Sequence, residues 1–360
     1  MAFGKEDVLS VSGEYGVINQ IAFQGRSFAG ESVADYHVVE TDDIVYTKSP
    51  LKANPYGIIK VNKGIPGIVS TLYAVYHPLN TVAPRFVDLY FANNLRLNKF
   101  LKPLVNIGAK HDMKVNNSFV LTGTVVFPSI GEQQKLVDFF AKLDRRIEAQ
   151  RKIVEALKKY KRGLNRRLLS QIEESYNCKL GSVCTIMGGG TPDTLHDEYW
   201  GNSVEWFTPS EIGKTKYVNS SVRKLSNEGL SNSSAKLLPA GTVLLTTRAT
   251  LGEMSIAEKE CSTNQGFQSL IPLMSRVSSE YLYYMQIIIK PWCEKYASGN
   301  TFREISKSAL SECIIPVPEK TQQDKIVKLL SAVDTLIAFE EKEASLLVQM
   351  KNSLLQQLFI

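Results

Sequence analysis

The chain reads PSIGEQQKLVDFFAKLDRRI over residues 128–147 and PEKTQQDKIVKLLSAVDTLI over residues 318–337. These stretches begin a repeat that covers residues 128–169 and 318–359, with a constant spacing of 190 positions and no gap. The matched pairs include Pro128 and Pro318, Gln133 and Gln323, Asp144 and Asp334, and Lys161 and Lys351. A repeat at a fixed distance indicates two copies of one structural unit.

Both copies carry apolar residues at alternating steps of four and three positions. This is the heptad pattern by which two helices pack along a continuous seam. The predicted seam residues are Leu136, Phe140, Leu143, Ile147, Val154, Leu157 and Leu164 in the first copy, and Ile326, Leu330, Val333, Ile337, Leu347 and Leu354 in the second. Because neither copy has an internal proline, each predicts one helix of about 40 residues, roughly 60 Å long. We expect the two helices to pack together; the alternative is two unrelated amphipathic helices on separate cores.

The repeat divides the chain into four parts. We expect a globular domain at residues 1–127, a long helix at 128–171, a second globular domain at 178–317 and a second long helix at 318–360. The predicted fold class is α+β, with two globular α/β domains separated by two long helices that form an antiparallel coiled coil.

Within the globular domains, short β-rich runs alternate with Gly, Pro and Asn. Such runs lie at residues 43–46, 69–76, 242–245 and 268–271, and helical stretches are expected at 86–100 and 279–296. Each domain is expected to end in an apolar strand, at 124–128 and 313–318. The segment LGSVCTI at 180–186 has no partner in the first domain, so we expect that domain to lack an initial strand or helix.

Size and composition are those of a folded, soluble protein. A chain of 360 residues can form two cores of ordinary size, and 44% of its residues are hydrophobic. Its longest apolar patch, near residues 287–289, ends at Lys290-Pro291, far short of the ~20 residues of a membrane span. The N-terminus lacks the apolar stretch of a secretory signal. Five widely spaced cysteines without a C-x-x-C pair favour a reduced, cytoplasmic protein without disulfides or a zinc site.

The net charge of +6 is unevenly distributed. Residues 131–171 contain twelve Lys and Arg against five Asp and Glu, whereas residues 320–360 contain five of each. A basic stripe is expected on a protein that binds a polyanion. A charged outer face also keeps a long helix in solution, so both interpretations remain open.

Several fragments that suggest catalysis fail on spacing. The GKT at residues 213–215 would need glycine at position 208 to form a phosphate loop, and the chain has Thr208. The NPY at 54–56 lacks the second proline of the methyltransferase motif and is typical of a turn. Glu211 and Lys214 are three positions apart, whereas one face of a nuclease strand requires two. The four histidines show no metal-ligand spacing. We therefore expect a binding protein with no catalytic residue, metal or cofactor of its own.

Three motifs resemble those of the specificity subunits of type I restriction-modification enzymes. The first is GGTP at residues 189–192, followed by YW at 199–200 and WFTPSEI at 206–212. The second is GNTFREISKSAL at 299–310. The third is the start of each long helix, EQQ at 132–134 and QQ at 322–323. Together with the repeat, this resemblance covers nearly the whole chain, although the first domain has no counterpart of GGTP.

The resemblance implies two target-recognition domains, each reading one half of a bipartite site in double-stranded DNA, with the long helices setting the spacer. It also implies two methyltransferase subunits docked on this frame, joined by restriction subunits. S-adenosylmethionine, ATP and Mg would then belong to those partners, and no membrane is involved. Two alternatives remain open: a coiled-coil adaptor whose domains bind protein, and a nuclease or methyltransferase that acts alone.

Candidate DNA contacts are polar side chains near strand ends and in the family motifs. Base readout needs donors and acceptors, and phosphate contact needs cations or backbone amides. In the second domain, Arg248 after Thr247 could bind guanine through two hydrogen bonds, and Asn264, Gln265 and Gln268 are candidate readers of adenine. The motifs add Gly189, Gly190 and Thr191, and also Gly299, Asn300, Thr301 and Arg303. In the first domain, Thr47, Lys48 and Lys52 follow the equivalent strand, and Lys110 and His111 take the place of Asn300 and Thr301. For each, an ordinary turn or loop residue is the alternative.

Overall fold

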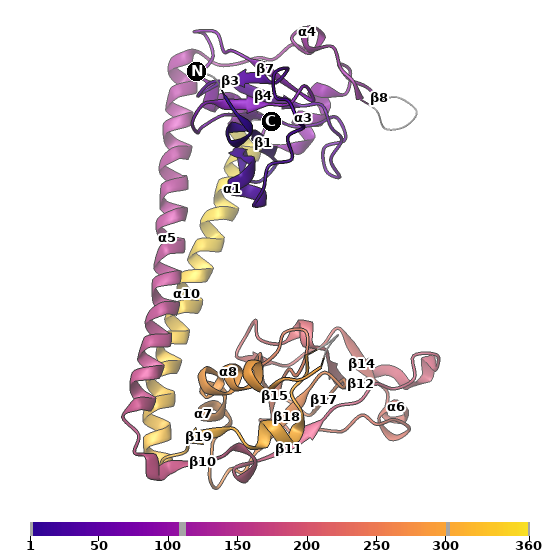
Figure 1. The fold of residues 1–360 in the computed structure, drawn as a ribbon, viewed down its shortest axis with the longest axis vertical. Helices are drawn as coiled ribbons and strands as arrows, with labels where there is room; N and C mark the ends of the chain where they lie inside the picture. The colour runs from indigo at the N-terminus through magenta and orange to yellow at the C-terminus, as the bar shows by residue number, and fades with distance from the viewer. Residues whose placement is uncertain (1–2, 108–112, 300–302, 359–360) are drawn as a thin grey trace. The chain divides into compact units, whose positions relative to one another are not determined.

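A computed structural model gives the fold and describes residues 3–107, 113–299 and 303–358 (Figure 1). The candidates Lys110, His111, Asn300 and Thr301 lie outside these ranges. The chain divides into two compact units. Unit 1 contains Met1–Lys152 and Lys342–Ile360, and unit 2 contains Ile153–Glu341. Each long helix therefore contributes one segment to each unit.

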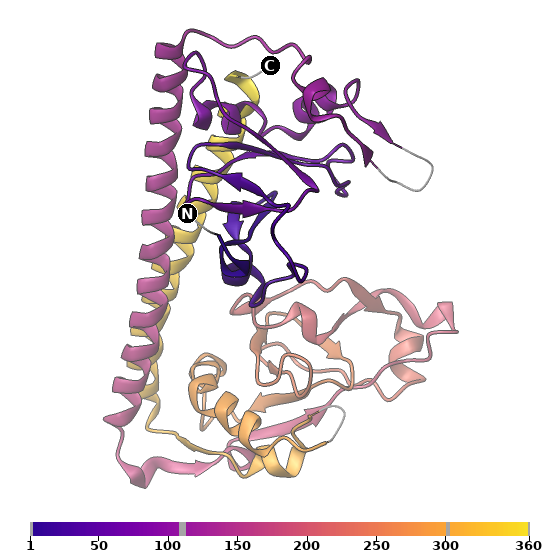
Figure 2. The same cartoon turned by 45° about the horizontal axis from the view of Figure 1, so that its top comes forward.

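The two predicted long helices are present as α5 (Ile130–Ser170) and α10 (Lys320–Leu358). In both units their segments lie side by side (Figures 1 and 2). In unit 1, the Nζ of Lys351 lies 2.5 Å from the Oδ1 of Asp144. In unit 2, Lys161 forms an ion pair with Asp334, and the Nζ of Lys158 lies 2.9 Å from the Oε1 of Glu341. As the residue number rises along α5, the number of the partner residue in α10 falls. The two helices are therefore antiparallel, as predicted.

The two aspartate–lysine pairs are copies of one another. Lys351 is the repeat of Lys161, and Asp144 is the repeat of Asp334, each at a distance of 190 positions. One contact is therefore made twice, once in each unit, with the roles of the two helices exchanged.

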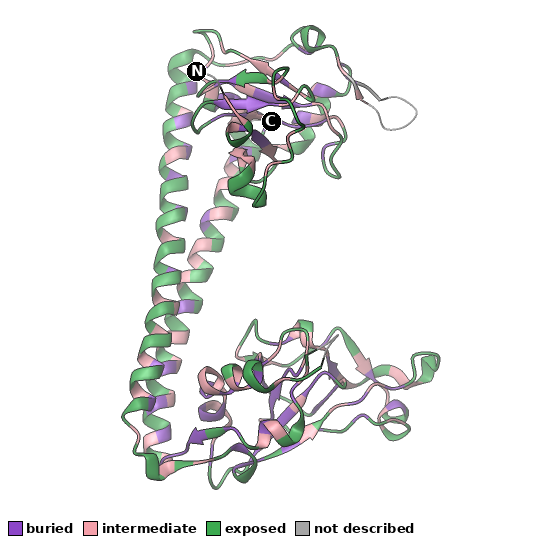
Figure 3. Cartoon of the chain, in the orientation of Figure 1, coloured by how far each residue is buried: buried purple, intermediate pink, exposed green. Residues whose placement is uncertain are grey.

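The inner faces of α5 and α10 are apolar, as the buried positions along both helices show (Figure 3). Every predicted seam residue is buried or half-buried. In unit 1, Leu143 and Ile147 share a cluster with Leu347. In unit 2, Leu164 packs against a cluster that contains Leu330. The heptad positions therefore lie on the faces that become buried. Burial of these apolar faces drives the association of two amphipathic helices.

The first domain is built from short strands and helices. The strands are β1 (Leu9–Ser12), β2 (Gly16–Asn19), β3 (His37–Val39), β4 (Ile44–Thr47), β5 (Ile59–Val61), β6 (Gly67–Val69), β7 (Tyr73–Tyr76), β8 (Asn106–Ile107) and β9 (Met113–Lys114). The helices are α1 (Gln20–Gln24), α2 (Pro84–Tyr90), α3 (Asn94–Leu101) and α4 (Asn117–Val120). The central sheet has the order β5-β4-β7, and the buried side chains of Tyr46, Phe91 and Leu101 belong to its core.

The second domain has the same plan with more strands. These are β10 (Asn177–Lys179), β11 (Cys184–Gly188), β12 (Trp200–Phe207), β13 (Tyr217–Val218), β14 (Arg223–Leu225), β15 (Val243–Leu245), β16 (Met254–Ala257), β17 (Cys261–Thr263), β18 (Gln268–Pro272) and β19 (Ile314–Pro316). The helices are α6 (Asn227–Ser231), α7 (Ser279–Tyr284), α8 (Gln286–Tyr296) and α9 (Lys307–Ser311). The main sheet has the order β11-β18-β15-β16-β13. Its central three strands correspond to β7, β4 and β5 of the first domain.

Two local predictions need correction. Each predicted helical stretch is split, the first between α2 and α3 and the second at Met285 between α7 and α8. The predicted closing strand at 313–318 is present as β19, but residues 124–128 are not a strand. The reason is pairing: β19 forms a ladder with β10, and among the described residues the first domain has no strand in the position of β10.

A buried glutamine fixes each domain to the start of its long helix. The amide group of Gln133 donates to the carbonyl oxygens of Thr81 and Pro128, and its Oε1 accepts from the backbone N–H of Ala83 at 2.9 Å. Gln323, its repeat, donates to the carbonyl oxygens of Arg276 and Pro318 and accepts from the N–H of Ser278 at 3.2 Å. Both side chains are almost fully buried, with exposures of 1% and 0%. The same three hydrogen bonds therefore orient both domains on the frame.

Replacing Gln323 by alanine should destabilise unit 2. The substitution leaves a buried backbone N–H and two carbonyl groups without their partner, and such losses cost about 1–3 kcal/mol for each buried group left unpaired. We expect a lower urea midpoint for the transition reported by the second domain. Gln322→Ala is the matched control, because Gln322 is the half-buried neighbour on the same turn. Equal midpoints for the two variants would contradict the anchoring role.

Candidate nucleic-acid interface

The turn that follows β15 places Arg248 at its tip. Thr247 is fully buried: its backbone N–H donates to the carbonyl oxygen of Gly266 at 2.8 Å, and its hydroxyl donates to the Oε1 of Glu304 at 3.1 Å. Ala249 has a φ of 59°, which side chains other than glycine rarely adopt. Such strain concentrates at functional turns. Of the two predicted residues, Thr247 therefore stabilises the turn. The side chain of Arg248 is half-buried and remains accessible for contact with DNA.

The loop between β17 and β18 lies directly beside this turn. A Cβ built at Gly266 would be 3.4 Å from the Nε of Arg248 and 3.0 Å from the Oδ1 of Asn264. The Oδ1 of Asn264 also accepts from the N–H of Gly266 at 2.9 Å. The nearest atom to such a Cβ would be the Cγ of Pro209 at 2.8 Å, so glycine leaves room chiefly for Pro209, and Arg248 lies beside it. Sequence reasoning missed Gly266, since only the neighbouring loop shows why it is needed.

The predicted amide readers differ in their accessibility. Gln265 is exposed, and its Oε1 accepts a short hydrogen bond from the hydroxyl of Thr191. Gln268 is half-buried, and its Oε1 is a buried atom without a hydrogen-bond partner. An unpaired buried acceptor is unusual and calls for a functional or structural reason. Asn264, Gln265, Thr191 and Arg248 thus converge on one polar surface, which the sequence predicted residue by residue but not as a group.

The glycines of the GGTP motif serve the packing of the domain. The backbone N–H of Gly190 donates to the carbonyl oxygen of Thr263 at 2.8 Å, and its own carbonyl accepts from the Nε1 of Trp206 at 3.0 Å. A Cβ at Gly189 would lie 2.1 Å from the carbonyl oxygen of Asn264. Both positions therefore need glycine for close approach, and the amide of Gly190 is already used within the domain.

Residues 303–305 lie against the Arg248 turn, since Glu304 and Ile305 both contact Thr247. Gly299 has a φ of 122°, and the guanidinium of Arg303 donates to the carbonyl oxygen of Glu294 at 2.5 Å, near the end of α8. The N–H of Ile305 donates to the carbonyl of Thr247 at 3.3 Å, which ties the segment to the Arg248 turn. Arg303 therefore has a structural partner at a helix C-terminus, where a cation is favourable.

In the first domain, the described candidates follow β4. Thr47 is buried, whereas Lys52 is exposed in the next loop. The Nζ of Lys48 donates to the Oδ1 of Asn117 at 3.4 Å, and partial burial lowers the pKa of its ammonium group. Antiparallel pairing sets Thr47 opposite Tyr73 of β7. The structure thus offers Lys48 and Lys52 as cations, without the polar loop cluster seen around Arg248.

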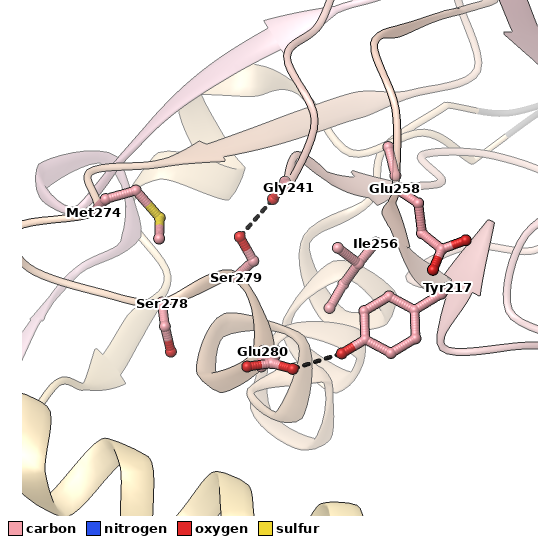
Figure 4. Close-up of a pocket in the computed structure, with 9 residues that line it drawn as sticks. Tyr217, Gly241, Ile256, Glu258, Met274, Ser278, Ser279 and Glu280 are labelled. Carbon is pink, nitrogen blue, oxygen red and sulfur yellow. Dashed lines mark hydrogen bonds between the residues drawn. The ribbon is translucent and has the colours of Figure 1, made fainter. Parts of the chain in front are cut away.

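A separate pocket of about 360 Å³ lies between β13, β16 and α7 (Figure 4). Its wall contains Tyr217, Glu258 and Glu280, and no lysine or arginine. The hydroxyl of Tyr217 donates to the Oε1 of Glu280 at 2.5 Å, and burial together with this carboxylate raises the pKa of the hydroxyl. Two carboxylates make the pocket unfavourable for phosphate, so it is not part of the candidate interface.

Across the described parts of the chain, no group of three or more His, Cys, Asp or Glu side chains could hold a metal ion. Nor does any described helix combine the length and apolarity needed to cross a membrane.

Comparison with known proteins agrees with this architecture. The family model for the type I restriction modification DNA specificity domain matches residues 172–348. The specificity subunit of the type I restriction enzyme MjaIX of Methanocaldococcus jannaschii is 35% identical over 186 residues, which cover 51% of this chain and 43% of that relative. The chain therefore spans less than half the length of that relative.

Two solved structures share the fold. One comes from work on complex assembly and conformational transition of the type I R-M system, with a TM-score of 0.61, 20% identity and coverage of 91% of this chain and 84% of that one. The other is the S subunit of the type I restriction-modification system of M. genitalium, with a TM-score of 0.50, 15% identity and coverage of 99% and 89%. Paired repeat helices that carry two related domains define a modular two-domain architecture. Residues 172–348 of this chain are therefore similar to the DNA specificity domain of type I restriction-modification enzymes.

If Arg248 reads a base, Arg248→Ala should relax specificity at one position of one half-site. Losing a bidentate contact costs roughly 1–3 kcal/mol of discrimination. The measurement is methylation of a DNA library randomised at both half-sites by the reconstituted complex. Arg303→Ala is the control, since its guanidinium serves a helix end, and it should leave the base preference unchanged. An unchanged preference in both halves with Arg248→Ala would remove Arg248 from the readout.

Proposed function

We propose that this chain is the DNA-recognition and scaffold subunit of a type I restriction-modification complex. Each globular domain reads one half of a bipartite site in double-stranded DNA, and the paired helices set the spacer between the halves. Two methyltransferase subunits dock on the frame, and restriction subunits join through them. Catalysis belongs to these partners, which bind the S-adenosylmethionine, ATP and Mg.

The observation that carries the proposal is the doubled anchor. Gln133 and Gln323 make the same three hydrogen bonds to their respective domains. A protein that reads two half-sites at a defined separation needs both readers fixed to one frame in equivalent ways. The polar surface around Arg248 supplies the chemistry of base readout in the second domain, and Lys48 and Lys52 supply cations in the first.

Repeated apolar positions on the outer faces of the helices support two docking surfaces. Phe139 in unit 1 is 47% exposed, and its repeat Leu329 in unit 2 is 50% exposed. Tyr160 in unit 2 is 58% exposed, and its repeat Met350 in unit 1 is 45% exposed. Large apolar side chains on a surface favour protein contact. Because both units carry an equivalent set, two copies of the same partner should bind.

The expected stoichiometry is therefore two methyltransferase subunits for each copy of this chain, as measured by the mass of the reconstituted complex. Leu329→Asp should reduce it to one methyltransferase, because a buried unpaired carboxylate is costly at an apolar contact. Lys328→Asp, a charge change at the exposed neighbouring position, is the control and should retain both. A one-to-one complex of the unaltered chain that methylates the bipartite site would contradict the proposal.

DNA binding by the complex should weaken steeply with salt. If the domains neutralise Z phosphates, log K falls with log salt at a slope of about −0.9Z. A protein-binding adaptor, the alternative function, would show no such slope and no sequence preference.

The isolated chain incubated with S-adenosylmethionine and DNA should transfer no methyl group. Transfer by the chain alone would assign catalysis to it.

A further inference from the structure

A polar network in unit 2 joins the second domain to both long helices at one tyrosine. The hydroxyl of Tyr284, at the end of α7, donates to the Oδ2 of Asp334 at 2.7 Å and lies 3.0 Å from the Oγ of Ser331. Both of these partners belong to α10. The side-chain amide of Asn165, in α5, donates to the backbone carbonyl oxygen of Tyr284 at 2.9 Å. Tyr284 is only 2% exposed, so these contacts are made away from water.

Lys216 completes the network from another part of the second domain. Its Nζ donates to the hydroxyl of Tyr284 at 3.2 Å and to the Oγ of Ser331 at 3.1 Å. The Oε1 of Glu280 is farther from this Nζ, at 3.9 Å. The side chain of Lys216 is 13% exposed, and burial lowers the pKa of its ammonium group. A buried ammonium group needs acceptors at close range, and Tyr284 and Ser331 supply them.

The first domain has a leucine where the second domain has Tyr284. The two glutamine anchors accept from the backbone N–H groups of Ala83 and Ser278, which therefore occupy equivalent places. The sixth residue after each is Leu89, in α2, and Tyr284, in α7. Leu89 has no polar side-chain atom and packs against the apolar cluster of unit 1.

The helix residues next to these positions differ in the same way. Leu355 is the repeat of Asn165, and Ala141 is the repeat of Ser331. Leu355 is buried in the same cluster against which Leu89 packs. The aspartate–lysine pair between the helices is present in both units. Each domain therefore meets helix residues that match its own polarity, polar in unit 2 and apolar in unit 1.

We propose that the helix segments of each unit select their own domain by this polarity. The seat in unit 2, formed by Asn165 and Ser331, accepts a domain that presents a tyrosine and a lysine. The seat in unit 1, formed by Leu355 and Ala141, accepts a domain that presents a leucine. A mismatched domain would leave buried polar groups without partners, which is unfavourable. This selection acts on attachment alone, so it does not depend on what the domains bind.

The test exchanges the chemistry of the seat and of the domain within unit 2 of the full-length chain. The seat variant is Asn165→Leu with Ser331→Ala, which introduces the residues of the unit 1 seat. The domain variant is Tyr284→Leu with Lys216→Met, which removes the polar groups that face the seat. All three tryptophans of the chain, at positions 200, 206 and 292, lie in the second domain. Their fluorescence during urea unfolding therefore reports the stability of this domain.

Each variant alone should raise the equilibrium constant for unfolding about 5- to 150-fold for each buried polar group that it leaves unpaired. The combination should be partly rescued, because replacing both partners by apolar groups removes the unpaired groups. We expect its unfolding constant to lie at least about tenfold below the value given by multiplying the two separate effects. Effects that simply multiply would overturn selection by polarity.

Tyr283→Leu is the matched control. Tyr283 is the neighbouring half-buried tyrosine, and its hydroxyl forms no hydrogen bond with a described residue. Its effect should simply multiply with that of the seat variant. Coupling as strong as that of the domain variant would assign the result to packing and would also overturn the proposal. If the domain variant does not fold, Tyr284→Phe, which keeps the ring and removes the hydroxyl, replaces Tyr284→Leu in the same comparison.

Discussion

The apolar seam between α5 and α10 is the interaction on which the rest of this structure depends. In proteins most of the stability of a helix comes from packing an amphipathic face, and α5 and α10, with 41 and 39 residues, bury their heptad faces along this seam. The antiparallel direction brings Lys351 to Asp144 in unit 1 and Lys161 to Asp334 in unit 2. These pairs are partly exposed and contribute little free energy on their own. Their value is in fixing register, since a slip by one turn would break both.

The buried glutamines extend this order from the helices to the domains. Each glutamine lies near the start of its long helix, and its amide group reaches a loop about fifty positions earlier in the sequence. It forms hydrogen bonds with backbone groups at the helix start and in that loop. Gln133 and Gln323 do this with the same atoms and equivalent partners. The same anchor in both repeats lets two domains with different surfaces attach to their helices in the same way. The surface around Arg248 and the cations Lys48 and Lys52 show how far those surfaces have diverged.

Features that depend on local periodicity can be predicted from the sequence. Features that depend on contacts with residues distant in sequence cannot. The seam residues from Leu136 to Leu354 could be identified because heptads are a local pattern. The role of Gln323 could not, because its partners Arg276 and Ser278 are brought to it only by the fold. Residues 124–128 have the composition of a strand, yet a strand exists only where another pairs with it. The same limit applies to the candidate site: the sequence predicts a role for Arg248, but it does not show that Gly266 lies beside it.

We propose that the paired helices set the distance between the two domains that read DNA. Inserting one heptad into both helices, after Lys152 and after Glu341, keeps the seam in phase and lengthens the frame by about 10 Å. At 3.4 Å per base pair this corresponds to roughly three base pairs. Sequencing of the DNA positions methylated by the reconstituted complex measures the spacer directly. We expect unchanged half-sites separated by a spacer about three base pairs longer. Methylation that retains the original spacer would contradict it.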